Sequence, residues 1–218
     1  RMCDRVTLIT GGPIDDIAST LLTDMDKVIC ADGGVDFALR NSIRFDEVFG
    51  DFDSITPGAK EYIDTHDIEV HTFPVEKDMT DTELALRTIS KTKDILLICP
   101  LAGRIDHVMT NLNLIARLRE EGYSITASDG ITDIIPLAGE DYISINGLVD
   151  ASKLAVSLIP LSETVTGVTT KGLYYECDNA TFNFGSSFSN SNHIKSGEDG
   201  FEIEMKSGRL LVIITDCV

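Results

Sequence analysis

The sequence predicts an α/β amino-terminal domain with a mainly parallel, Rossmann-like sheet, followed by an all-β sandwich or barrel. Two observations predict this arrangement. Over residues 1–138, short runs rich in β-branched residues alternate with stretches of helical spacing, which is typical of a parallel sheet covered by helices. Over residues 139–218, strand-like runs are separated by turns, and no convincing helix is present. The predicted domain boundary therefore lies between residues 138 and 139.

The first domain contains six predicted strands. Helical spacing follows at 78–90 and at 105–121, where Val108, Leu112, Ile115 and Leu118 can form one apolar stripe. A further helix is expected to start at Thr56-Pro57, a good cap followed by a good first position. The strand-like runs are 5–10, 27–31, 46–50, 68–72, 94–99 and 123–128.

The second domain also contains six predicted strands. The segment Lys206-Ser207-Gly208-Arg209 has the composition of a tight hairpin connection between the last two of them. The strand-like runs are 141–147, 153–160, 164–173, 179–185, 200–208 and 209–216. Many short strands without helices favour a small sandwich or barrel.

Composition and charge exclude several classes of protein. The chain has 218 residues, of which 43% are hydrophobic and 25% charged, as in folded proteins with one large or two modest domains. Lys and Arg total 18 against 36 Asp and Glu, which gives a net charge of −18. This balance argues against a nucleic-acid partner, because binding to phosphate backbones needs a basic surface. It suits divalent cations and cationic small molecules.

A cytoplasmic location without a membrane partner is expected. No apolar run approaches the roughly 18–20 residues that span a bilayer, and the first residues lack the layout of a secretory signal. Cysteine usage agrees, because the number is odd, the spacings are wide and no C-x-x-C occurs, which favours reduced thiols. The cysteines are Cys3, Cys30, Cys99, Cys177 and Cys217.

Acidic residues follow several of the predicted strands of the first domain. Asp32 lies in ADGG, Asp51 and Asp53 in GDFDS, and Asp106 in GRIDH, while Asp78 and Asp81 open a predicted helix. In a parallel sheet these turns share one edge, where ligands bind. Two like charges about 4 Å apart repel by roughly 4 kcal/mol at an effective dielectric of 20, and a cation relieves this repulsion. The pattern therefore predicts a site for Mg²⁺ and a nucleotide, since Mg²⁺ prefers carboxylates and phosphates.

Each motif also has a purely structural interpretation. GDFDS could be an Asx turn entering a helix, and Thr80 with Glu83 forms a capping box in which Asp81 favours the helix N-terminus. The glycine pairs Gly11-Gly12 and Gly33-Gly34 could allow tight turns, or could let backbone N–H groups approach phosphate. The shared placement after successive strands favours the functional interpretation.

Taken in order and spacing, the motifs ADGG, GDFDS, EKDMTD, GRIDH, KGL and SNSN resemble the thiamin pyrophosphokinase family over nearly the whole chain. The resemblance implies transfer of the pyrophosphoryl group of ATP to the hydroxyl of thiamin, giving thiamin diphosphate and AMP, with Mg²⁺ as cofactor. It also implies a nucleotide-binding catalytic domain, a thiamin-binding β-sandwich and a homodimer with sites between subunits.

The resemblance assigns roles to matching residues. Asp51, Asp53 and Asp81 are implied as the Mg²⁺ ligands, Arg104 and Asp106 as further catalytic residues, and Asp106 also as a thiamin contact. The implied ATP-binding residues are Gly12, Asp32, Gly33, Gly34, Lys77, Asp78, Thr80 and Arg104. For thiamin, the SNSN motif adds Ser189, Ser191 and Asn192. Which carboxylate would act as the base, Asp32 or Asp106, stays open.

Two features depart from the family pattern. The chain has no Trp, whereas some relatives use a Trp near thiamin, and KGLYYEC replaces the more usual K-G-L-K-[YW]. An aromatic face could instead come from Tyr174, Tyr175 or Phe188.

Two competing functions are considered. A haloacid-dehalogenase-like phosphatase would use Asp51 as nucleophile and Asp53 as acid, but Ile55 replaces the usual Thr or Val and the motif follows the third strand instead of the first. A non-catalytic module that senses a nucleotide or thiamin would need fewer acidic residues than converge here.

Overall fold

The computed structural model describes residues 5–50, 55–73 and 78–216. The chain divides into two compact units, one made of 1–110 and 123–131 and the other of 111–122 and 132–218. The change of unit at 131/132 precedes the predicted domain boundary at 138/139, which stays a prediction. None of the helices within the described ranges has the length and hydropathy of a membrane-spanning segment.

The first unit contains six sheet strands in the order β6-β5-β1-β2-β3-β4, and all of these pairs are parallel. The elements of this part of the chain are β1 (Arg5–Ile9), η1 (Asp16–Leu21), β2 (Lys27–Ala31), α1 (Gly34–Arg40), β3 (Glu47–Phe49), α2 (Pro57–Thr65), β4 (Glu69–His71), α3 (Asp81–Thr88), β5 (Asp94–Ile98), α4 (Ile105–Glu120) and β6 (Ser124–Ser128). All six predicted strands are confirmed.

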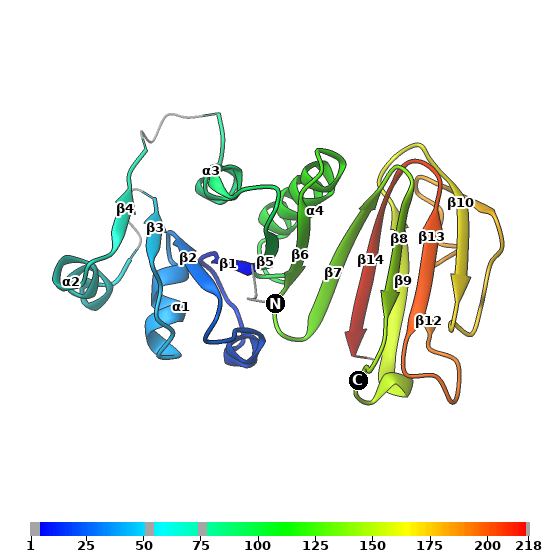
Figure 1. Ribbon diagram of the computed structural model, residues 1–218, viewed down its shortest axis with the longest axis horizontal. Coiled ribbons are helices and arrows are strands. Elements are labelled where there is room, and N and C mark those ends of the chain that lie inside the picture. Colours follow the sequence, from blue (N-terminus) through cyan, green and yellow to red (C-terminus); the bar gives the residue numbers. More distant parts are fainter. Residues whose placement is uncertain (1–4, 51–54, 74–77, 217–218) are drawn as a thin grey trace. The chain divides into compact units, whose positions relative to one another are not determined.

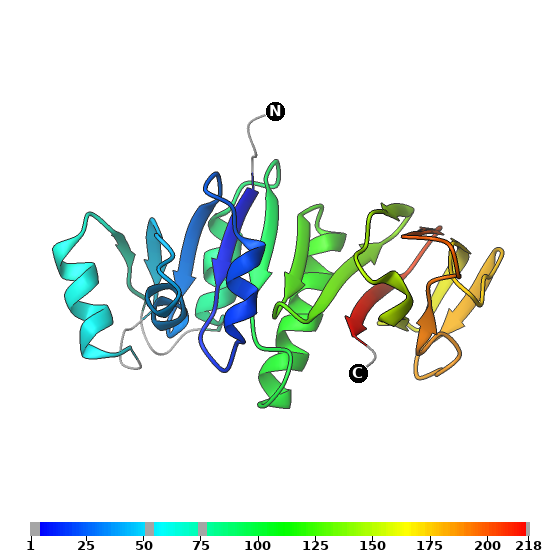
Figure 2. The same ribbon diagram turned by 90° about the horizontal axis from the view of Figure 1, so that it is seen from below.

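Helices lie on both faces of this sheet. In Figures 1 and 2, α1 and η1 lie on one face, and Figure 1 places α3 on the other. The first face buries Val28, Cys30 and Val48 in a core with Val35 and Phe37 of α1. The strands are apolar on both faces, as expected for a parallel sheet covered on both sides. Helix α2 begins as the sequence predicts, with Thr56 as its cap and Pro57 in its first turn.

The second unit is an antiparallel sandwich, in which four strands ordered β12-β9-β14-β7 face a four-stranded sheet ordered β11-β10-β13-β8. Its elements are β7 (Thr132–Ala138), β8 (Asp141–Ile145), η2 (Ala151–Lys153), β9 (Leu154–Pro160), β10 (Thr164–Lys171), β11 (Ala180–Asn183), β12 (Asn192–His193), β13 (Phe201–Met205) and β14 (Arg209–Asp216). Alternate side chains of both sheets meet in one core, for example Val156, Val212, Val168 and Ile203.

The hairpin predicted at 206–209 is wrong. Strand β13 pairs with β10 and β8, whereas β14 pairs with β7 and β9, so the chain crosses here from one sheet to the other. Gly208 makes this corner possible, because its φ is +98° and a Cβ there would lie 2.5 Å from the carbonyl oxygen of Thr164. Strand β7 was missed, since it lies within the segment assigned to the first domain and contains Pro136.

Candidate functional site

The loops that follow β1, β2, β3 and β5 lie together at the carboxyl edge of the parallel sheet. Backbone hydrogen bonds continue the ladder beyond the strands, from Thr10 N to Ile98 O (2.9 Å), Asp32 N to Phe49 O (2.9 Å) and Gly50 N to His71 O (3.1 Å). The order of strands reverses at β1, which has β2 on one side and β5 on the other. Such a switch point is the usual ligand-binding position in open α/β sheets.

Glycines let these loops touch. A Cβ on Gly11 would lie 3.0 Å from the Cα of Gly33, and a Cβ on Gly12, whose φ is +118°, would lie 2.6 Å from the ring of Pro100. A Cβ on Gly34 would lie 2.1 Å from the carbonyl oxygen of Ile9. The glycines singled out in the sequence therefore allow three loops to approach closely, which larger residues would prevent.

Asp32 lies at the centre of this edge. Its φ is +47°, in the left-handed region, and its Oδ1 would be 2.2 Å from a Cβ on Gly50. Gly50 was not singled out from the sequence, although this residue opens the motif GDFDS. In the structure its φ of +148° explains why glycine stands there. The carboxylate of Asp32 thus lies against the residue that directly precedes Asp51. Asp51, Asp53 and Lys77 themselves lie outside the described residues.

Replacing Gly34 by Ala is expected to lower the free energy of unfolding by about 1–3 kcal/mol, because the added Cβ meets a backbone oxygen that cannot rotate away. Urea denaturation measures the change. Gly58→Ala is the matched control: it lies in α2 with no atom within 4 Å of its Cβ, and a helical Ala is favoured over Gly. Equal stability of the two variants would contradict the close approach of α1 to β1.

The other acidic motifs begin helices. Thr80 caps α3, since its Oγ1 accepts a hydrogen bond from Glu83 N at 3.2 Å, and Asp81 is the first residue of that helix. Asp78 precedes the cap by two residues and is exposed. The structural interpretation of Thr80 is therefore confirmed, while a role of Asp78, Thr80 or Asp81 in ligand binding stays a prediction.

Arg104 and Asp106 form an ion pair where α4 starts. Nη2 of Arg104 lies 2.5 Å from Oδ2 of Asp106 and Nε lies 3.2 Å from Oδ1, and both side chains are exposed. The hydrogen bond from Arg104 lowers the pKa of Asp106 below its usual value, and the same bond raises that of Arg104. Asp106 is thus held as a carboxylate.

The SNSN motif makes internal hydrogen bonds in the second unit. Asn192 is buried; its Oδ1 accepts from Tyr175 N at 3.1 Å and from His193 N at 2.9 Å, while its Nδ2 donates to Tyr175 O at 2.9 Å. Ser189 Oγ donates to the carbonyl oxygen of Leu158, and Ser191 N donates to Ser157 Oγ at 2.9 Å. The motif therefore fixes the backbone of Tyr175 and joins its own loop to β9.

Aromatic rings gather beside Asn192. Tyr174 stacks on His193 with ring centroids 4.6 Å apart, and Tyr175 meets Tyr174 edge-on at 4.8 Å. Tyr174 and Tyr175 are 59% and 68% exposed, so their rings face solvent. Phe188, at 76% exposure, lies against Phe182 instead.

Comparisons with known proteins agree along the chain. Residues 18–127 match the model of the thiamin pyrophosphokinase catalytic domain, and residues 148–210 match that of the thiamin pyrophosphokinase vitamin B1 binding domain. Thiamine pyrophosphokinase of Bacillus subtilis is 31% identical over 87% of this chain and 89% of the relative. Thiamine pyrophosphokinase 1 of Oryza sativa is 26% identical over 80% and 75%.

Solved structures agree as well. The crystal structure of thiamine pyrophosphokinase from Bacillus subtilis has a TM-score of 0.83 at 26% identity and covers 98% of this chain and 100% of its own. That from Geobacillus thermodenitrificans has a TM-score of 0.82 at 25% identity with the same coverage. These matches favour a pyrophosphokinase over the phosphatase and the sensing module. The chain therefore belongs to the thiamin pyrophosphokinase family, whose members are enzymes that make thiamin diphosphate.

Proposed function

We propose that this enzyme transfers the pyrophosphoryl group of ATP to the hydroxyl oxygen of thiamin with the help of Mg²⁺. The observation that carries this proposal is the meeting of four glycine-containing or acidic loops at one sheet edge, with the carboxylate of Asp32 against Gly50. Exposed backbone N–H groups in such loops suit phosphate, and the switch point at β1 suits a nucleotide bound in the Rossmann-like manner. Gly12, Gly33 and Gly34 would line the phosphates.

The acidic donor set fits Mg²⁺. Carboxylate oxygens are its preferred protein ligands, and Asp51, Asp53 and Asp81 would hold it near Asp32. When bound, the ion neutralises the negative charge of the polyphosphate. Lys77, Asp78 and Thr80 precede Asp81 directly and would border the same phosphates, while Arg104 would donate to phosphate oxygens.

In the proposed reaction the hydroxyl oxygen of thiamin attacks the β-phosphorus of ATP, and the bond from this phosphorus to the oxygen bridging the α- and β-phosphates breaks. AMP leaves with the bonding electrons, and the alcohol loses its proton. Asp106 is a weak base because Arg104 lowers its pKa. We therefore propose that Asp106 positions Arg104 and the thiamin alcohol, and that Asp32 takes the proton.

Product analysis tests the reaction. With ATP, Mg²⁺ and thiamin, AMP and thiamin diphosphate should form in equal amounts, and chelation of the metal should stop both. ADP formed together with thiamin monophosphate would contradict the proposal, because it would indicate transfer of a single phosphoryl group.

For thiamin, we propose that the exposed ring of Tyr175 supplies the aromatic face and that Asn192 positions it. The buried amide of Asn192 holds both the N–H and the carbonyl of Tyr175, which fixes the direction in which the ring leaves the backbone. A fixed electron-rich ring suits the thiazolium cation and pyrimidine of thiamin. Ser189 and Ser191 would border the same rings from the SNSN loop.

Replacing Asn192 by Ala should raise the KM for thiamin at least about fivefold, with less effect on the KM for ATP, because Tyr175 loses its support while the proposed nucleotide edge is untouched. Steady-state kinetics with each substrate varied measures both constants. Asn190→Ala is the control: Asn190 lies in the same motif but is exposed, and among the described contacts its side chain accepts a hydrogen bond from Ser157 Oγ alone. An unchanged KM for thiamin would remove Asn192 from the site.

We further propose a cytoplasmic homodimer with sites between subunits. The family resemblance supports the dimer. The location is supported by Cys30, Cys99 and Cys177, which are outside disulfides, two of them buried. Light scattering at micromolar protein concentration tests the assembly, and a monomeric mass of the active enzyme would contradict it.

A further inference from the structure

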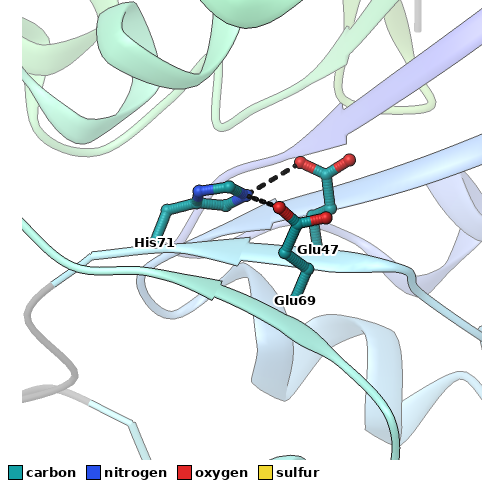
Figure 3. A group of neighbouring side chains, drawn as sticks. All are labelled: Glu47, Glu69 and His71. Carbon is teal, nitrogen blue, oxygen red and sulfur yellow. Dashed lines mark hydrogen bonds and ion pairs between the residues drawn. The ribbon is translucent and has the colours of Figure 1, made fainter.

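Two short strands at one side of the parallel sheet bring together three side chains that can bind a metal. Glu47 lies on β3, and Glu69 and His71 lie on β4. The strands pair in register, with Glu47 opposite Glu69 and Phe49 opposite His71, so all four side chains leave the same face. Figure 3 shows the three potential ligands turned toward one another.

The distances match the first shell of a small cation. Nε2 of His71 lies 3.1 Å from Oε2 of Glu47 and 3.5 Å from Oε1 of Glu69, and the potential ligand atoms all lie within 4.8 Å of one another. Two ligands each about 2.1 Å from a tetrahedral ion are roughly 3.4 Å apart. An ion could therefore enter with only small movements of the side chains.

Hydrogen bonding alone does not account for the convergence. A ring nitrogen carries at most one hydrogen, so the two carboxylates near His71 Nε2 have at best one N–H to share, and each hydrogen bond is weakened. Glu47 and Glu69 are also directly opposite each other on neighbouring strands, where like charges repel. Lys27 pairs with Oε1 of Glu47 and relieves part of this repulsion, which leaves Oε2 directed at His71.

The surroundings hold the ligands in place and leave an entry path. The His71 ring stacks on Phe49 with centroids 4.2 Å apart, and the carboxylate of Glu47 is 12% exposed. Glu69 is 68% exposed and lies on the solvent side. Two ligands held by neighbouring side chains and one exposed ligand form a partly prepared site.

We propose that Glu47, Glu69 and His71 bind a divalent transition-metal ion of the zinc class, which would join the edge strand β4 to β3. One imidazole nitrogen and two carboxylates with room for water suit Zn²⁺, whereas Mg²⁺ prefers oxygen ligands throughout. The ion would cross-link a three-residue edge strand that pairs only with β3 among the described strands. Its three ligands are different residues from the carboxylates proposed for Mg²⁺.

Calorimetric titration of the full chain with Zn²⁺ in millimolar Mg²⁺ tests this proposal, because Mg²⁺ occupies sites made of carboxylates alone. We expect Glu69→Gln and His71→Gln each to weaken one Zn²⁺ site at least tenfold. Glu61→Gln, an exposed change of the same charge on α2, should leave the affinity unchanged. Lys27→Gln should strengthen binding, since the ammonium group competes for Glu47.

A second measurement does not depend on variants. The chain has four histidines, so their ring nitrogens can be followed by NMR, and Zn²⁺ should shift Nε2 of His71 selectively. Absence of Zn²⁺ binding up to millimolar concentration, or binding that leaves Nε2 of His71 unchanged, would overturn the proposal. Undiminished binding by a folded His71→Gln variant would overturn it as well. Pyrophosphokinase activity does not enter either readout.

Discussion

Replacement of Asp51 by Asn is expected to lower the turnover number at least about tenfold, equivalent to roughly 1.4 kcal/mol of activation free energy. The substitution keeps the size of the side chain but removes a negative charge from the proposed Mg²⁺ ligands. The ion would then neutralise the polyphosphate less well in the transition state. Formation of AMP and thiamin diphosphate at saturating substrate measures the effect.

Asp64→Asn provides the matched control for this variant. Asp64 is an exposed residue of α2, so the same change of charge should leave turnover within about twofold of the unsubstituted enzyme. Circular dichroism should show that both variants are folded. Near-normal production of AMP by the Asp51→Asn enzyme would exclude Asp51 from the metal site.

Replacement of Asp26 by Asn is expected to have the largest effect on the stability of the fold. The carboxylate of Asp26 is 0% exposed and accepts hydrogen bonds from Arg5 Nη2 (2.6 Å), Arg5 Nε (3.1 Å), Thr23 Oγ1 (2.9 Å) and Thr7 Oγ1 (3.2 Å). Replacement by Asn would leave the buried side of Arg5 without its counter-charge. We expect the free energy of unfolding at pH 7 to fall by about 3 kcal/mol, as measured by urea denaturation.

The effect should depend on pH. Burial by itself raises the pKa of Asp26, but hydrogen bonds from Arg5 and Thr23 outweigh it, so the pKa in the folded protein lies below the usual value of 3.8. A carboxyl group with a lowered pKa contributes stability above its unfolded pKa, and this contribution is lost as the pH falls through the folded pKa. The difference between the two proteins should therefore shrink below about pH 4.

Asp24→Asn is the control in the same turn, because Asp24 is exposed. It should change the free energy of unfolding by less than about 0.5 kcal/mol. An Asp26→Asn variant as stable as the Asp24→Asn variant at pH 7 would contradict the role of the Arg5–Asp26 pair.

The sequence predicts most strands because burial on both faces of a parallel sheet selects continuous β-branched runs. Such runs mark β1, β2 and β5 to within one residue. Strand β7 escapes because Pro136 has no backbone N–H to donate to a strand ladder, so its presence in the sequence argues against a strand. In addition, the residues at both ends of TDIIPLA are polar or small, so its apolar run is short.

Strand pairing in the second unit could not be predicted to the same degree. The composition of 206–209 specifies a turn, but it does not specify whether the chain returns along the same sheet or crosses to the opposite one. That choice depends on the core, where Met205 and Leu210 are both fully buried from different sheets. Local turn chemistry carries no information about such long-range packing.

The sequence predicts which loops share the carboxyl edge of the sheet, but it does not predict their contacts. Strand–turn spacing places Asp32 and the glycine pairs at one edge, because parallel strands all end there. The close approach of Asp32 to Gly50, and of Gly34 to Ile9, depends on strand register and turn geometry. Similarly, the sequence SNSN does not reveal that Asn192 is buried and that its side chain hydrogen-bonds both the N–H and the carbonyl of Tyr175.

The most direct test of the proposed site is a crystal structure with Mg²⁺, thiamin and α,β-methylene-ATP, in which carbon replaces the oxygen at the bond that breaks. We expect Mg²⁺ on the polyphosphate with Asp51, Asp53 and Asp81 as its protein ligands, at the carboxyl edge beside Asp32. A structure in which these carboxylates lie far from the metal, or in which the nucleotide binds away from this edge, would contradict the proposed site.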